Sequence, residues 1–161
     1  MGSLVSSSSK RSAYEHCRPV LKHESEQIDE IAIYENGLIA PGLLIGQLIY
    51  HVFILIRTRQ GRFILLEVER CQDGNINIHK EEGKSREHVI GLRLNKKDPA
   101  NMWLFLSVYN DARLFHVQSI VDNYHWDKYN TLNKNCITLV NEIFAVCGWP
   151  YAGYRQDKAI I

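Results

Sequence analysis

Apolar residues fall into short runs over the first two thirds of the chain and into one helical pattern near its end. The strongest run covers residues 47–58 and is followed, after Arg59-Gln60-Gly61, by a second run over 62–70. Both runs are rich in Ile, Val, Leu and Phe, and a short link that contains Gly is typical of a tight turn. The pattern therefore predicts an antiparallel hairpin.

Weaker alternation and turn residues mark the elements around this hairpin. Further strands are predicted at 31–34, 75–79 and 88–94, turns at 35–37 and 73–74, a charged loop at 80–87, and a short strand or turn near 114–117. Asp98-Pro99 suits the start of a helix over 100–110, because Asp caps helices and Pro fits their first turn.

The last predicted element is a helix over residues 135–147. Apolar residues recur at helical spacing from Cys136 to Cys147, and Gly148 and Pro150 end the segment. Because the strands come first and the helices follow, we expect an α+β fold, with a mainly antiparallel sheet packed against helices.

The composition is that of an ordinary globular domain. The chain has 161 residues, of which 45% are apolar and 23% charged, and these values exclude a wholly disordered or coiled-coil chain. A flexible serine-rich tail is expected at 1–12 and a single domain at 13–161. A net charge of +1 gives no general attraction for phosphate backbones, so no nucleic-acid partner is expected.

The cysteine and hydrophobic patterns indicate a cytoplasmic protein. The four cysteines form no CxxC pair and no zinc-binding spacing, so neither a metal site nor a disulfide scaffold is expected. The polar N-terminus does not resemble a secretory leader. The longest apolar stretch, 43–56, is shorter than the roughly 20 residues that a membrane span needs.

The first residues match an N-myristoylation pattern. Gly2 and Ser6 occupy its two defining positions, and Lys10 and Arg11 follow as a small basic supplement. One acyl chain would hold the domain only marginally at a membrane. Alternatively, the opening Met-Gly-Ser is a plain polar start or a cloning remnant.

The candidate nucleophile is Cys136. It lies in the first turn of the last predicted helix, where the helix dipole and unpaired N–H groups favour a thiolate. Asn135, directly before it, suits the N-cap, and this first turn is also the candidate oxyanion site. Alternatively, Cys136 is an unreactive core cysteine.

A thiol nucleophile needs a base, and His51 is the candidate. It interrupts the most apolar strand, and because an unpaired buried imidazole is costly, a partner is expected. A three-residue turn places Glu69 directly opposite His51 and Glu67 diagonally on the same face. Both are candidates to orient the imidazole, with Glu69 slightly preferred. Alternatively, they are solvated carboxylates paired with a nearby arginine.

The residues around Cys136 resemble a known sequence box. The segment YNTLNKNCITLVNEI, residues 129–143, resembles the NC-x-x-F-V box of the lecithin–retinol acyltransferase-like family and is similar to the NC box of the PPPDE-type isopeptidases. Both families belong to the circularly permuted papain-like, NlpC-type thiol hydrolases, in which a strand histidine precedes the cysteine. The segment YHVFIL, residues 50–55, resembles that histidine box, and the resemblance covers about residues 45–150.

The chain departs from these families at several positions. Leu139 stands where the box usually has an aromatic residue. Glu67 or Glu69 stands where the acyltransferase-like families often have a second histidine. The C-terminal anchor of many acyltransferase-like members is also not expected here.

The resemblance implies a circularly permuted papain-like fold and a cysteine-dependent hydrolase or acyltransferase. Cys136, activated by His51, would attack an ester, amide or isopeptide and form a thioester, with no metal or organic cofactor. The substrate is expected to be a lipid or a protein or peptide acyl group, so a thiol protease, an isopeptidase and a lipid acyltransferase all stay open. The alternative is a non-catalytic module on the same fold that binds a lipid or a protein segment.

Overall fold

The computed structural model describes residues 18–39, 48–94, 96, 99–149 and 159–160. The tail predicted at 1–12, the myristoylation pattern at Gly2 and the predicted helix start at Asp98 lie outside the described residues. No helix in the described ranges is long and apolar enough to cross a membrane.

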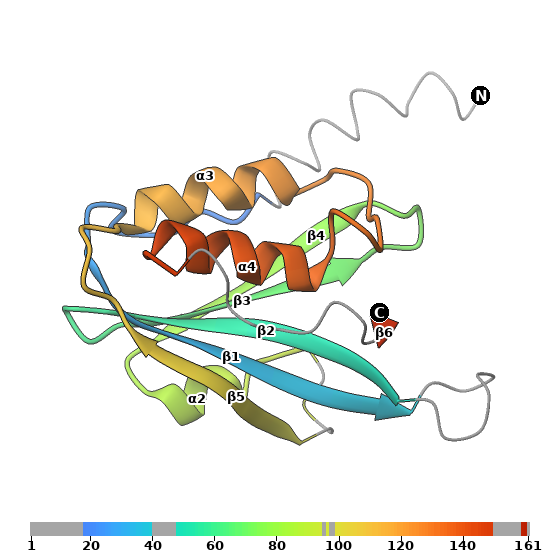
Figure 1. Ribbon diagram of the computed structural model, residues 1–161, viewed down its shortest axis with the longest axis horizontal. Coiled ribbons are helices and arrows are strands. Elements are labelled where there is room, and N and C mark those ends of the chain that lie inside the picture. Colours follow the sequence, from blue (N-terminus) through green and yellow to red (C-terminus); the bar gives the residue numbers. More distant parts are fainter. Residues whose placement is uncertain (1–17, 40–47, 95, 97–98, 150–158, 161) are drawn as a thin grey trace.

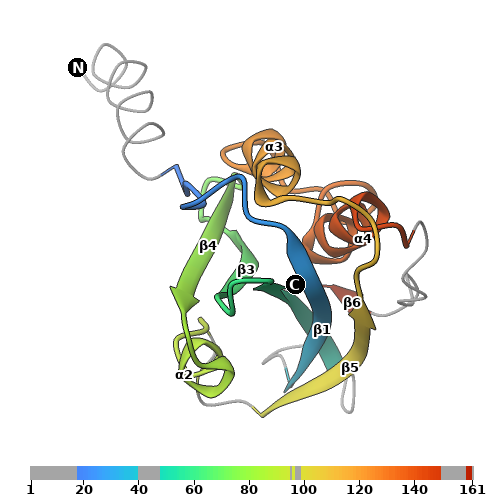
Figure 2. The ribbon, with the colours of Figure 1, turned by 90° about the vertical axis from the view of Figure 1, so that its left-hand side faces the viewer.

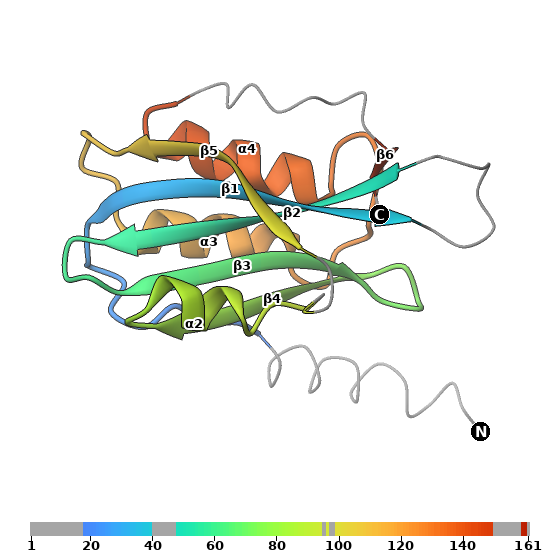
Figure 3. The same ribbon diagram turned by 90° about the horizontal axis from the view of Figure 1, so that it is seen from below.

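An antiparallel sheet forms the centre of the described structure. Its strands are β1 (Ile28–Ile39), β2 (Leu48–Thr58), β3 (Phe63–Arg70), β4 (Ile76–Gly83), β5 (Ala100–Ser107) and β6 (Ala159–Ile160). The order across the sheet is β4-β3-β2-β1-β5, and β6 pairs with β2 in parallel orientation (Figure 3). The hairpin predicted over 47–70 is therefore β2 and β3.

Helices lie on both faces of this sheet in the described part of the chain. α3 (Leu114–Tyr124) and α4 (Cys136–Val146) pack together over one face (Figure 1), and the short α2 (Arg86–Ile90) lies against the other. Figure 2 shows the same layers from the side. The prediction of an α+β fold with an antiparallel sheet packed against helices is confirmed.

The two faces of β2 bury different side chains. Ile54 and Ile56 belong to the apolar cluster under α3 and α4, whereas Phe53 and Leu55 belong to a second cluster with Val89 of α2. Because both faces are covered, the strand has a continuous apolar sequence instead of an alternating one.

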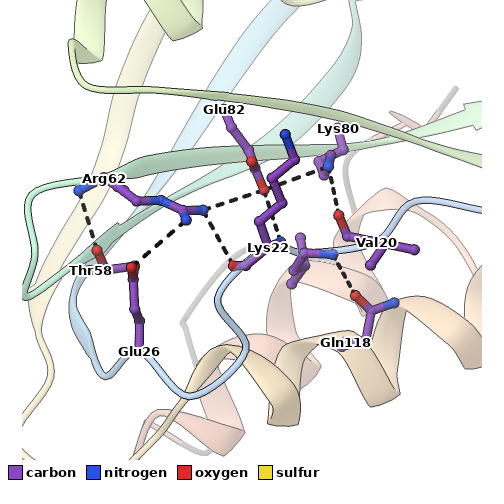
Figure 4. Close-up of polar contacts among 9 residues, drawn as sticks. Val20, Lys22, Glu26, Thr58, Arg62, Lys80, Glu82 and Gln118 are labelled. Carbon is purple, nitrogen blue, oxygen red and sulfur yellow. Dashed lines mark hydrogen bonds and ion pairs between the residues drawn. The ribbon is translucent and has the colours of Figure 1, made fainter.

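The segment before β1 lies between α3 and the β3–β4 edge of the sheet (Figure 4). The Leu21 N–H donates to Gln118 of α3 at 2.7 Å, and Lys80 of β4 donates to the Val20 carbonyl at 2.7 Å. The Leu21 side chain is buried in the main core. These contacts attach residues 18–22 to α3, to β4 and to the main hydrophobic core.

Three local predictions are wrong before residue 95. β1 continues through Glu35-Asn36-Gly37, predicted as a turn, because pairing with β2 and β5 outweighs the local turn preference. β4 runs to Gly83, into the predicted charged loop, because it pairs with β3 along this stretch. The segment 88–94 is predicted as a strand, but its first residues belong to α2. Ser85 caps this helix by accepting a hydrogen bond from the His88 N–H.

Two further predictions fail after residue 95. The predicted helix over 100–110 is β5, because aromatic residues such as Trp103 favour a strand and the edge of β1 is there to pair with. The short strand or turn predicted near 114–117 is the first turn of α3. By contrast, the helix predicted at 135–147 is present as α4.

Candidate functional site

The N-terminus of α4 is fixed by the side chain of Asn135. Its Oδ1 accepts hydrogen bonds from the N–H groups of Ile137 and Thr138 at 2.9 and 3.0 Å. Its Nδ2 donates to the carbonyls of Asn130 and Thr131 at 3.1 and 3.0 Å. The N-cap prediction is confirmed, and the same contacts leave the Asn135 side chain no free donor for an oxyanion.

Thr138 closes the cap from the other side, a contact that the sequence analysis did not identify. Its hydroxyl accepts a hydrogen bond from the Asn135 N–H at 2.8 Å and another from Tyr124 of α3 at 2.9 Å. A threonine three residues after an Asn N-cap is the sequence signal of such a reciprocal cap. The start of α4 is therefore fixed both to its own loop and to α3.

Cys136 is the first residue of α4 and is 1% exposed. At this position its N–H has no partner inside the helix. Its thiol lies close enough to the imidazole of His51, which lies in β2 and is 5% exposed, to raise the pKa of that imidazole. The structure thus brings together the predicted nucleophile and the predicted base.

Glu67 in β3 completes a line of three side chains. Its Oε2 lies 2.9 Å from Nε2 of His51, and its Oε1 accepts a hydrogen bond from the Leu94 N–H at 2.9 Å. The residue is 0% exposed. Because Glu67 engages Nε2, Nδ1 is the ring nitrogen that remains for the thiol of Cys136.

The hairpin register is as predicted, but the preferred glutamate is corrected. Phe53 pairs with Glu67 as expected, and the β2–β3 pairing is not continued beyond this pair toward His51. β3 continues in register with β4 alone, where Glu69 lies opposite Asn77 and accepts a hydrogen bond from it at 3.2 Å. The contact with His51 therefore goes to the diagonal neighbour, Glu67.

The electrostatics of the site favour a charged imidazole. Burial alone would lower the pKa of His51, but hydrogen bonds with Cys136 and Glu67, and the charges of both groups, raise it to about 9. At neutral pH His51 is therefore expected to be an imidazolium between two acidic groups.

Tyr129 belongs to the same neighbourhood. Burial, and next the proximity of Cys136, raise the pKa of its hydroxyl group. The guanidinium of Arg70 lies over its ring, 5.3 Å from the centroid. The loop before α4 thus places an aromatic side chain, that of Tyr129, near the thiol of Cys136.

No group of His, Cys, Asp or Glu side chains that could hold a metal ion occurs within the described ranges. Comparisons with protein-family models, curated proteins and solved structures find no match.

Proposed function

We propose that the protein is a cysteine-dependent acyl-transfer enzyme, a hydrolase or an acyltransferase, in which Cys136, His51 and Glu67 act as nucleophile, base and orienting carboxylate. The observation that supports this most directly is the hydrogen bond of 2.9 Å between His51 and the fully buried Glu67, with the thiol of Cys136 next to the same imidazole. Burying an ion pair costs desolvation free energy. A cysteine nucleophile, however, needs an imidazole beside it and a third group that orients the imidazole.

The proposed reaction has two steps. The Cys136 sulfur attacks a carbonyl carbon, and the carbonyl electrons move to oxygen, which the Cys136 N–H at the helix start stabilises. The tetrahedral intermediate expels an alcohol or amine, which takes its proton from His51. Water or an acceptor alcohol or amine then gives its proton to His51, attacks the thioester and releases Cys136.

The proposal extends to the class of fold and to location. The order of histidine before cysteine, with the cysteine at a helix start and the histidine on a strand, supports the circularly permuted papain-like, NlpC-type class. We also propose cytoplasmic location, with peripheral membrane attachment through Gly2 depending on whether the chain is myristoylated.

The test is the pH dependence of thiol modification by methyl methanethiosulfonate, followed at Cys136 by peptide mapping. An ordinary thiol loses about tenfold in rate for each pH unit below about 8.5. We expect the rate at Cys136 to change by less than about threefold between pH 8 and pH 6. The change His51→Ala should restore the ordinary pH dependence, whereas His88→Ala, at an exposed position of α2, should leave the rate unchanged.

One observation favours the alternative of a non-catalytic binding module on the same fold. Cys136 is 1% exposed, so an acyl substrate reaches it only if the surrounding structure opens. An ordinary pH dependence at Cys136, or the same rate in the His51→Ala variant, would contradict the enzyme and leave the binding module.

A further inference from the structure

Asn36 of β1 is a buried polar residue that the reaction scheme above does not use. Its side chain is 0% exposed, and neither Nδ2 nor Oδ1 has a hydrogen-bond partner within the described part of the chain. Buried amides in folded proteins are nearly always paired, and each unpaired group calls for an explanation. The two unpaired atoms of Asn36 leave both a donor and an acceptor without a partner.

The position of Asn36 links it to the site. It pairs with His51 across the β1–β2 ladder. Side chains directly opposite each other in an antiparallel pair lie on the same face, with Cβ atoms about 5 Å apart. Because the strand order is β3-β2-β1, Glu67 flanks His51 on one side and Asn36 flanks it on the other.

We propose that Asn36 is a specificity-determining residue that binds a secondary amide of the acyl substrate, next to the carbonyl that Cys136 attacks. A secondary amide offers one acceptor and one donor, and the Asn carboxamide offers the complementary pair. An ester linkage at the same place has acceptors only, so it would leave Oδ1 buried without a partner. The site therefore selects amide-containing acyl groups over ester-linked ones.

The burial of Asn36 fits this role. Asn36 is 0% exposed and lies opposite the 5% exposed His51 in the β1–β2 pair, so an acyl group bound beside the imidazole would also lie beside the Asn36 carboxamide. A binding site built to pair with a polar group rejects an analogue that lacks this group far more strongly than an apolar pocket does. The inference rests on the proposed function, because it assumes that Cys136 attacks an acyl group.

The test compares two peptidyl acyloxymethyl ketones that differ in one linkage. In the first the residue next to the reactive ketone is joined by a backbone amide, and in the second by an ester. We expect the wild-type chain to react at Cys136 at least about tenfold faster with the amide probe. In the Asn36→Leu variant, which keeps the side-chain shape, the two rates should agree within about twofold.

Two controls separate this inference from the proposed function. Methyl methanethiosulfonate carries no amide, so its rate at Cys136, measured in the wild type and in Asn36→Leu, is the reference by which each probe rate is divided. The change Asn101→Leu, at an exposed position of β5, should leave the preference for the amide probe intact.

Equal rates of the two probes in the wild type would overturn the role of Asn36, and this comparison needs no variant to fold. A preference that persists in Asn36→Leu would also overturn it. Failure of the proposed function is seen independently, because the pH dependence of methyl methanethiosulfonate modification in wild type and His51→Ala reports on the thiol alone.

Discussion

The two ends of α4 each carry a buried cysteine, and only one of them has the surroundings of a nucleophile. Cys136 and Cys147 are both 1% exposed. Cys136 begins the helix beside His51, whereas Cys147 caps its C-terminal end, where the helix dipole is negative. Burial raises the pKa of Cys147 to about 12, and no partner among the described residues offsets this effect.

The comparison shows that burial alone makes a thiol inert. Cys136 has the same degree of burial, but an imidazole lies beside it and it begins a helix, which are the surroundings that a cysteine nucleophile needs. Substitutions at one end of α4 that leave the other end unchanged can therefore test whether Cys136 has a reactivity that Cys147 lacks.

The largest difference is expected when each cysteine is removed in turn. Cys136→Ala should abolish covalent labelling by the peptidyl acyloxymethyl ketone, whereas Cys147→Ala should keep labelling within about twofold of the wild type. Mass spectrometry of the labelled chain measures both. Equal losses in the two variants would mean that labelling reports only on the integrity of α4.

The next largest effect concerns the proton on His51. Because the charge and hydrogen bond of Glu67 raise the pKa of His51, Glu67→Gln should lower it from about 9, so the imidazolium is lost at lower pH. Cys136→Ala should lower it as well, and Cys147→Ala should leave it unchanged.

The measurement for this prediction is an NMR titration of the His51 ring. A wild-type ring that titrates near its ordinary value of about 6.5 would contradict the proposed ion pair. A Glu67→Gln ring that still titrates near the wild-type pH would show that Glu67 orients the imidazole without tuning its charge.

The sequence was informative where local rules decide the structure. The length of the turn after Thr58 predicts the pairing of Phe53 with Glu67, and helical spacing together with an Asn N-cap predicts the start of α4. The helix pattern identified Cys136, and the polar interruption of the most apolar strand identified His51, the residue that the structure places next to it.

The sequence was misleading where pairing between distant segments decides. Local residue preferences predict a turn through Asn36, yet β1 continues there because β2 and β5 pair with it, and this pairing places Asn36 beside His51. The choice between Glu67 and Glu69 depends on where the β2–β3 ladder ends, which the local sequence does not encode.

A smaller effect is expected from the cap at the Cys136 end of the helix. Asn135→Ala removes four hydrogen bonds of the cap and should lower the free energy of unfolding by about 1 to 2 kcal/mol. It should also slow Cys136 modification, because the thiol is no longer held against His51. Urea denaturation and thiol modification measure the two effects, and a loss of stability without slower modification would mean that the cap does not position the thiol.

The smallest effect is expected from Glu69→Gln, and this variant sharpens the contrast between neighbouring glutamates. Glu69 contacts Asn77 on a half-exposed part of the β3–β4 pair, so its loss should change stability by less than about 0.5 kcal/mol. The pKa of His51 should stay near the wild-type value, since Glu69 is not among the groups that raise it. If Glu69→Gln shifted the titration of His51 as far as Glu67→Gln does, the charge of the sheet edge as a whole, and not one oriented carboxylate, would set the state of the imidazole.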